Sequence, residues 1–405
     1  MSSYLQSVTV KNRKYDLNFK DCFAVNLIND GNCVRDGYGL TEITSVLSSS
    51  GAVAFYRVDG KYFLCYSDGK VYQLSSIFRA FRGSAGIKTP VVCGVQKGNT
   101  VKYIFVGESS FDLNGEEIDL PASTVATVFN GRLFTAKNRV ITFSKPFDFE
   151  NNAVSMETCG SLGVCESAGN VVGFFSDGDK LAIICERAIY SLTAIGESID
   201  FKFERLNIPV QNAKANTVKC FNDGCVFVDC NKLVKYSGGK LTEQKVTLKS
   251  LDFTIYGKAA KTDEIYILPV NVGGQDYLYV YSLIDGSESF IKGTYLVADG
   301  GYAYAGGEKV LQITSEVFTG ERVLKSNAMD FNDCEIKTIS EVSAFVGDKC
   351  ILTVKGEFGK KKFTLKSGAN KIKTNLKSKI FALEFSSTNP LLIKRASVKY
   401  RLKGE

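Results

Sequence analysis

The residue types that most often carry out catalysis are partly missing from this chain, because its 405 residues include no histidine and no tryptophan. The Ser-His-Asp and Cys-His nucleophile pairs are therefore excluded, together with His-ligated zinc and haem. Hydrolysis by paired carboxylates remains possible, since the chain has 43 Asp and Glu residues. The acids stand mostly in turns, where Asp before Gly favours chain reversal; examples are Asp59, Asp68, Asp177, Asp179, Asp223, Asp285 and Asp299. We therefore expect no catalytic residues and no enzyme.

The twelve cysteines could bind a metal, but their setting indicates structural thiols. Cys65, Cys93, Cys185, Cys225 and Cys230 lie inside apolar runs such as KLAIICERAIYSL, where a free thiol behaves as a small hydrophobic side chain. The tightest group stands at positions 220, 225 and 230, so successive members point to opposite faces of a strand. Without a CxxC pair or a histidine, this group does not match a zinc site. We predict neither a metal site nor a cofactor.

The C-terminal residues carry most of the chain's positive charge. Residues 351–405 contain 14 Lys or Arg and three acids, whereas the whole chain has a net charge of +7, so residues 1–350 are net −4. The candidate basic surface for contact with DNA or a protein partner consists of Lys360, Lys361, Lys362, Lys371, Lys373, Lys377, Lys379, Lys394 and Arg395. Three interpretations stay open: non-specific contact with DNA phosphates, contact with an acidic protein ring, and protection of sheet edges together with solubility.

The clearest structural pattern is the stretch from 124 to 152, which predicts three antiparallel strands. Its first strand ends at Asn130-Gly131, a pair that tolerates positive φ at both central positions of a type I′ hairpin turn. A second run covers 132–136, and a third covers 139–144 before Pro146, which cannot donate to a central ladder. Similar turns, most of them containing glycine, recur about every 40 residues, as in the four-stranded blades of a β-propeller.

The repeat predicts an all-β fold: a seven-bladed β-propeller, with six blades as the alternative, and an appended C-terminal β-sandwich-like domain. A chain of 405 residues exceeds the usual size of a single core, which favours two parts. We expect an N-terminal arm and lead-in strand over 1–43, the propeller over 44–320 and the basic C-terminal domain over 321–405. The sixth blade is placed at 251–290, and one or two helical turns are expected at 75–82. Unrelated hairpins in one or two sandwiches are the competing architecture.

Several short motifs resemble β-propeller structural proteins of tailed bacteriophages, namely the tail-hub, nozzle and packaged-DNA-stabilisation proteins. The matching positions are Arg35, Gly37 and Tyr38; Arg132, Leu133, Phe134, Ala136, Val140, Ser144 and Pro146; Glu186, Ile189, Tyr190 and Leu192; and Tyr236 and Gly238. The resemblance implies a non-enzymatic virion protein of the neck or tail, made in the bacterial host cytoplasm. It further implies a ring of identical subunits below the portal, part of the DNA conduit, with other virion proteins as partners and phage DNA nearby.

Two other functions are compatible with a propeller. A carbohydrate- or receptor-binding propeller, such as a tail adhesin or a glycosidase-like protein, predicts an aromatic-lined cup with two to three convergent carboxylates. An intracellular protein-interaction scaffold predicts contact surfaces only. The sequence contains no run of 18 apolar residues and its N-terminus lacks the apolar core of a signal peptide, so we expect a soluble chain without a membrane span.

Overall fold

The protein is all-β in a computed structural model, which describes residues 12–46, 51–97, 100–149, 159–195, 200–305, 308–314, 320–332 and 334–402. The chain forms two compact units. The propeller unit comprises Thr41–Leu278 and Gly293–Ile313, and the barrel unit comprises Met1–Leu40, Tyr279–Lys292 and Thr314–Glu405. Each unit is built from segments that are distant in the sequence.

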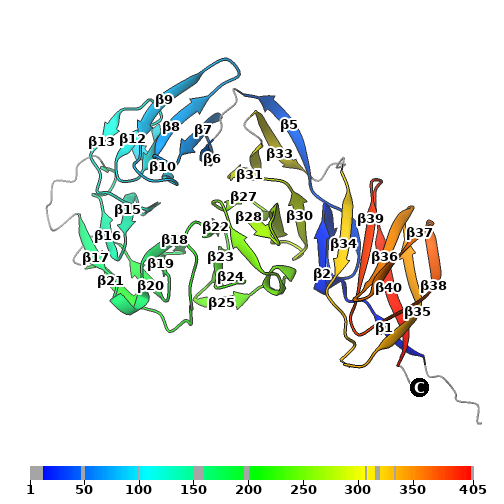
Figure 1. The fold of residues 1–405 in the computed structure, drawn as a ribbon. Helices are drawn as coiled ribbons and strands as arrows, with labels where there is room; N and C mark the ends of the chain where they lie inside the picture. Colours follow the sequence, from blue (N-terminus) through cyan, green and yellow to red (C-terminus); the bar gives the residue numbers. More distant parts are fainter. Residues whose placement is uncertain are drawn as a thin grey trace, which may run out of the picture. The chain divides into compact units, whose positions relative to one another are not determined.

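The propeller unit contains five four-stranded antiparallel sheets made of consecutive strands, set around a common centre (Figure 1). They are β6 (Ala52–Val58), β7 (Lys61–Tyr66), β8 (Lys70–Leu74) and β9 (Arg79–Ser84); β10 (Val91–Lys97), β11 (Thr100–Val106), β12 (Ser110–Asp112) and β13 (Glu117–Ile118); β14 (Val125–Phe129), β15 (Arg132–Lys137), β16 (Val140–Phe143) and β17 (Gly160–Gly163); β18 (Val171–Asp177), β19 (Lys180–Cys185), β20 (Ile189–Thr193) and β21 (Lys202–Arg205); and β22 (Lys219–Phe221), β23 (Gly224–Asp229), β24 (Lys232–Ser237) and β25 (Lys240–Glu243).

A sixth four-stranded sheet combines the two ends of the propeller sequence. It consists of β31 (Tyr295–Ala298), β32 (Tyr302–Ala305), β33 (Lys309–Thr314) and β5 (Gly39–Ser45), in that order. An ion pair of 2.7 Å between Lys309 Nζ and Glu42 Oε2 joins the last two strands. The early strand therefore closes the ring by completing its last blade.

The turns and cores follow the expected pattern. Asn130 and Gly131 both have positive φ, 46° and 71°, as the hairpin between β14 and β15 requires. Neighbouring sheets bury their faces against each other, since Phe134 of β15 and Phe174 of β18 belong to one hydrophobic core. One meander alone could not bury both faces, and the radial arrangement of sheets solves this. The propeller prediction is confirmed.

The predicted sixth blade, 251–290, is organised differently. Its strands β26 (Phe253–Ile255), β27 (Ala260–Lys261), β28 (Ile265–Val272), β29 (Gln275–Ser282) and β30 (Glu288–Lys292) belong by hydrogen bonding to a 16-stranded sheet. Within the propeller unit, β27 and β28 still lie between two blades: Tyr266 Oη donates to Thr217 O at 2.8 Å, and Gly300 N donates to Lys261 O at 2.7 Å. The described ring thus has six four-stranded blades. A further position in the ring is occupied by β27 and β28, whose strand pairing belongs to the 16-stranded sheet.

The barrel unit holds the other strands of the 16-stranded sheet. Its order is β37 (Gly359–Leu365), β36 (Cys350–Gly356), β39 (Phe381–Ser387), β34 (Arg322–Ser326), β2 (Cys22–Val25), β30, β3 (Leu27–Asn29), β4 (Val34–Asp36), β40 (Ile393–Leu402), β35 (Lys337–Val346) and β38 (Gly368–Ser378), with β1 (Arg13–Asp16) paired to β40. The terminal strands β37 and β38 are in contact, so the sheet curves into a barrel-like form. One core, including Leu27, Leu324, Leu352 and Val398, fills it.

Three local expectations change. The C-terminal domain is one barrel-like sheet where a sandwich was predicted, because β2, β3, β4 and β30 insert between its C-terminal strands. The segment 1–43 supplies β1 to β4 to this sheet and most of β5 to the propeller. The helical turns predicted at 75–82 were wrong: β9 begins at Arg79 as the outermost strand of its blade, where the alternation of apolar residues is weak. Among the described residues, no helix is long and apolar enough to cross a membrane.

Candidate functional site

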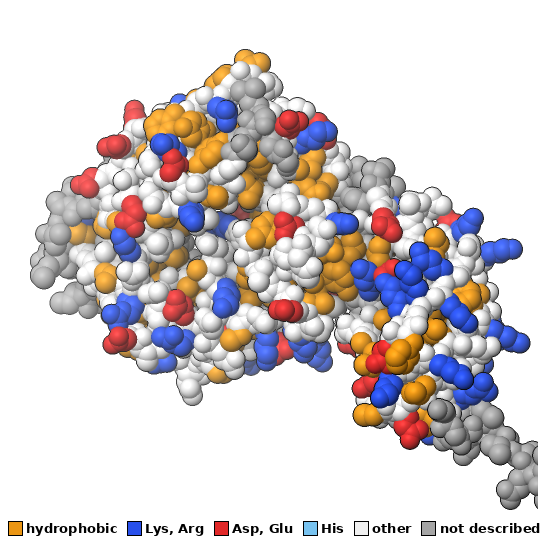
Figure 2. Space-filling model, in the orientation of Figure 1, with side chains coloured by type: hydrophobic (Ala, Val, Ile, Leu, Met, Phe, Trp, Pro, Cys, Tyr) orange, Lys and Arg blue, Asp and Glu red, His pale blue; other side chains and the backbone are white. Residues whose placement is uncertain are grey.

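The nine basic residues singled out in the sequence are all exposed and all lie in the barrel unit. Lys360, Lys361 and Lys362 belong to β37; Lys371, Lys373 and Lys377 belong to β38; Lys394 and Arg395 begin β40; and Lys379 follows β38. Figure 2 shows many Lys and Arg side chains over the part of the molecule that holds these strands. Six of the nine therefore stand on β37 and β38, the two edge strands of the sheet path.

The strand register separates the predicted basic residues of β38 and β40 from those of β37. Outward-facing cations of β1, β38 and β40, which pair directly or through β35, form what we call the basic face, which consists of Lys14, Lys371, Lys373, Lys377, Arg395, Lys399 and Arg401. In its central row, Lys373, Glu341, Lys399 and Lys14 are successive partners across β38, β35, β40 and β1. The sequence prediction missed residues 14, 399 and 401, because only the pairing of β1 and β35 with β40 places them beside the lysines of β38.

Acidic residues offset only part of this charge. Lys399 Nζ lies 3.1 Å from Glu341 Oε1, and the hydrogen bond from that lysine is the largest of several effects that hold the pKa of the Glu341 carboxyl below its ordinary value. Lys14 Nζ lies 2.7 Å from Asp16 Oδ1. The remaining cations leave an excess of positive charge, and an exposed phenyl ring, Phe345, lies among them. Such a face can bind an acidic protein surface or nucleic-acid phosphates.

The lysines of β37 occupy a different place. Lys360 and Lys362 pair with Lys355 and Thr353 of β36, whereas the Lys361 ammonium donates to the Thr374 carbonyl oxygen of β38 at 2.5 Å. That hydrogen bond spans the gap between the two edge strands. Charged side chains on an edge strand discourage pairing with another chain, so these three lysines fit edge protection.

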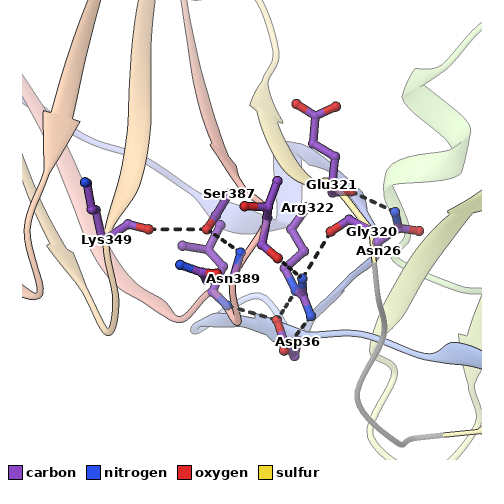
Figure 3. Close-up of polar contacts among 10 residues, drawn as sticks. Asn26, Asp36, Gly320, Glu321, Arg322, Lys349, Ser387 and Asn389 are labelled. Carbon is purple, nitrogen blue, oxygen red and sulfur yellow. Dashed lines mark hydrogen bonds and ion pairs between the residues drawn. The ribbon is translucent and has the colours of Figure 1, made fainter.

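An ion pair between a buried arginine and a partly exposed aspartate connects residues 35–38 to the C-terminal strands (Figure 3). Arg322 is 1% exposed, and its guanidinium donates to both carboxylate oxygens of Asp36, at 2.6 and 3.1 Å. The same guanidinium donates to the carbonyl oxygens of Gly320 and Thr388, while Asp36 also accepts from Leu391 N at 2.9 Å. We call this group the clasp; it holds β4, β34 and the lead into β40 together.

Other positions of the phage-like motifs also have structural contacts. Buried Arg132 donates to Ser144 O at 3.0 Å, and the Ser144 hydroxyl accepts from Leu133 N at 3.0 Å, which ties the start of β15 to the end of β16. Tyr236 Oη donates to Asp177 Oδ2 at 3.3 Å and so links two blades. These hydrogen bonds give Arg132, Ser144 and Tyr236 a structural role within the propeller.

A cavity of about 340 Å³ lies in the propeller unit and is lined by four blades and the residues before β27. Its walls are Phe55, Tyr56, Arg57, Val58 and Asp59 of the β6 hairpin; Val91, Val92, Gly94 and Tyr103 of β10 and β11; Val297 and Ala298 of β31 with Asp299 after it; Lys219 of β22; and Lys258 and Ala259. We call it the axial cavity. Across the ring beside it, Thr89 Oγ1 donates to Asn216 Oδ1 at 3.2 Å, which joins the approaches to β10 and β22.

The charged groups of the axial cavity were missed in the sequence. Asp299, interpreted as a turn residue, accepts from Lys219 Nζ at 2.9 Å and from Lys261 N at 2.9 Å. Desolvation acts to raise the pKa of Asp299, but the charge and hydrogen bond of Lys219, the charge of Lys258 and the hydrogen bond from Lys261 N together leave that pKa lowered. Lys258 Nζ lies 5.4 Å from the centre of the Tyr56 ring. Of the two carboxylates in the wall, Asp299 is paired with Lys219, so the cavity does not present the pair of available acids that glycoside hydrolysis needs.

The described residues contain no cluster of three or more His, Cys, Asp or Glu side chains able to hold a metal ion. Cys65, Cys93, Cys185 and Cys225 are buried free thiols, as expected, whereas Cys230 is partly exposed. The exposure of Cys230 could not be predicted from the sequence, because this cysteine follows an apolar run as the buried ones do.

No family model and no curated protein matches the chain. Among solved structures, it is similar to PorZ, described as an essential bacterial surface component of the type-IX secretion system of Porphyromonas gingivalis, with 12% identity, a TM-score of 0.41, and coverage of 87% of this chain and 46% of PorZ. Two structures of the extracellular domain of BT4673 from B. thetaiotaomicron match with 11% identity and TM-scores of 0.47 and 0.43, over 82% and 84% of this chain and 47% and 48% of theirs. The chain spans less than half the length of each of these proteins.

Proposed function

We propose that this protein is a non-enzymatic structural subunit of a tailed-phage virion, located in the neck or tail. In this role it assembles into a ring below the portal and contacts other virion proteins through the basic face. The observation that carries the proposal is that face, in which the cations of β1, β38 and β40 outnumber the acids beside them. Subunits of closed rings need specific contact surfaces and no reaction centre.

Two features support this role. The motifs that resemble phage propeller proteins lie on or next to the strands of three blades and on both sides of Asp36 of the clasp, which is compatible with the resemblance. In addition, the Thr89–Asn216 hydrogen bond crosses the propeller ring. A DNA conduit would therefore run between subunits of the assembled ring and not along the axis of one propeller.

The test is to locate the protein in particles of a phage whose genome encodes it. Purified virions are labelled with gold-conjugated antibody against the barrel unit and inspected by electron microscopy. Label at the tail or neck, with mass spectrometry giving a fixed copy number relative to the portal, is the expected result. Virions that lack the protein, or that carry it inside the capsid in variable amounts, would contradict the proposal.

A further inference from the structure

Among the described residues, Lys258 of the axial cavity makes no direct ion pair, although the charge of Asp299 acts on it from a distance. Lys258 Nζ donates to Pro90 O at 3.4 Å and faces the Tyr56 ring, and these are its contacts within the described part of the chain. By contrast, Lys219 in the same cavity is 13% exposed in its side chain and pairs with Asp299. A desolvated ammonium with one long hydrogen bond is costly, so a negatively charged ligand would stabilise it.

The electrostatics of the cavity agree with this. Burial, followed by the charge of Lys219, lowers the pKa of Lys258 to about 8. The other ionisable groups near Lys258 are Arg57, Asp59 and Asp299 in the cavity wall and the thiols Cys65 and Cys93. Burial raises the pKa of both thiols to about 12, so they stay neutral near pH 7. The three cations and two carboxylates of the wall leave one positive charge in excess.

We propose that the axial cavity is a binding site for a small organic carboxylate, whose anionic group pairs with Lys258 Nζ and whose apolar part lies against Val92, Tyr103 and Val297. A volume of about 340 Å³ is at the lower end of the range for small-molecule sites. One unmatched cation suits a single negative charge. A phosphate dianion fits less well, because Asp59 and Asp299 also line the wall.

Binding should take up a proton near pH 8. The bound carboxylate requires charged Lys258, so binding raises the pKa of this lysine. At pH 8 about half of the Lys258 side chains are neutral, and these take up a proton when the anion binds. At pH 6 the ammonium is already formed and no uptake is expected. Affinity should accordingly fall as the pH rises above 8.

The experiment is isothermal titration calorimetry of the full chain with sodium benzoate, with benzamide as the uncharged isostere and inorganic phosphate as the alternative anion. Benzoate should bind, and benzamide should bind at least tenfold more weakly, because the uncharged amide loses the charge-assisted hydrogen bond to Lys258 Nζ. Repeating the titration at pH 8 in buffers of different ionisation enthalpy measures the proton uptake on wild-type protein.

The variant Lys258→Met should lose at least tenfold in benzoate affinity, whereas Lys360→Met, which removes an exposed lysine from β37, should leave it unchanged. Circular dichroism checks that each variant is folded. The proposal is overturned if benzoate does not bind wild-type protein at millimolar concentration, if phosphate binds and benzoate does not, or if binding at pH 8 takes up no proton. Equal affinity in folded Lys258→Met would overturn it as well.

Discussion

Asp36 and Arg322 lie 286 positions apart and form a two-point ion pair inside the barrel unit, with nitrogen–oxygen distances of 2.6 and 3.1 Å. Bidentate arginine–carboxylate pairs add geometric specificity to the charge attraction. Two backbone carbonyl oxygens and the Leu391 amide complete the hydrogen bonding around the pair. The clasp therefore fixes the early strand β4 against strands formed by the end of the chain.

Replacing Arg322 by Met should destabilise the barrel unit by about 2 kcal/mol, because it removes several hydrogen bonds of a buried guanidinium and takes the counter-charge from Asp36, whose side chain is 28% exposed. Urea unfolding, followed by hydrogen exchange of barrel-unit amides, measures this loss. Lys355→Met is the matched control: this lysine is 45% exposed in its side chain, and its pair with Glu384 at 2.7 Å should contribute less than about 1 kcal/mol. A loss in Arg322→Met no larger than in the control would show that the clasp is not a stabilising contact.

Gly37 should not tolerate a side chain. A Cβ at this position would lie 2.7 Å from Leu27 N and 2.8 Å from Asn26 C, both backbone atoms that cannot rotate away. We expect Gly37→Ala to cost about 1–3 kcal/mol of barrel-unit stability, as overpacking typically does. Thermal unfolding of Gly37→Ala and of Gly359→Ala compares a crowded glycine with one that has open space around it. Equal melting temperatures would contradict the prediction.

The propeller could be predicted from the sequence because its determinants are local. Asn130-Gly131 and Asp59-Gly60 specify hairpins through their own backbone preferences, and each blade pairs strands that follow one another. The barrel could not be predicted in this way. Its sheet joins Val25 to Val323 and Val34 to Ile393, and hydrophobic alternation along one strand does not identify a partner about 300 residues away.

The candidate sites were limited for the same reason. The excess of lysine in residues 351–405 marked the correct unit, yet Lys14 joins the basic face only through the pairing of β1 with β40. Lys258 looks like an ordinary polar turn residue in the sequence. Only the closed ring brings it to the cavity that Lys219 and Asp299 also line.

The lysines of β37 should protect the sheet edge. Lys360→Thr combined with Lys362→Thr should increase aggregation on mild heating with little change in melting temperature, since charge removal exposes an edge that can pair with another copy. Lys325→Thr combined with Lys355→Thr removes the same charge from the interior strands β34 and β36 and serves as the control. Light scattering measures the outcome. Identical aggregation in both pairs would indicate a general effect of net charge.

The basic face should be needed for assembly. Lys371→Glu combined with Lys373→Glu reverses two charges at its centre and should sharply reduce incorporation of the protein into virions, as measured by immunoblot of purified particles. The control, Lys360→Glu with Lys362→Glu, makes the same change in net charge on β37 and keeps that edge charged. We expect the control to assemble normally. Normal assembly of both variants would eliminate the basic face as a contact surface.

Binding of DNA by the same face is measured with these two variants. If phosphates are contacted, the affinity of the wild-type protein for a DNA duplex falls steeply with salt, and each lost phosphate contact reduces the slope of log K against log salt by about one. We expect the Lys371/Lys373 variant to lose about two units of slope relative to the β37 control. Slopes that are equal in both variants would show that DNA does not contact residues 371 and 373.

Cys165 should be the most readily alkylated thiol of the folded protein near pH 7. It is exposed, and hydrogen bonds to its sulfur from Ser167, at 3.1 Å, and from Tyr190, at 2.9 Å, lower its pKa to about 7. Its thiolate fraction therefore rises through half at about pH 7, whereas burial raises the pKa of Cys93 to about 12. Iodoacetamide labelling at a series of pH values, followed by peptide mapping, measures the rate at each thiol.

Ser167→Ala provides the discriminating variant, because it removes the largest of these effects on the Cys165 sulfur and leaves the Tyr190 hydrogen bond in place. The midpoint of the labelling profile should move to higher pH, and a rise of one unit would slow labelling at pH 7 about fivefold. Cys334, the other exposed thiol among the described residues, should be labelled equally in both proteins and serves as the internal control. A Cys165 profile that keeps its midpoint in Ser167→Ala would show that the serine hydroxyl does not stabilise the thiolate.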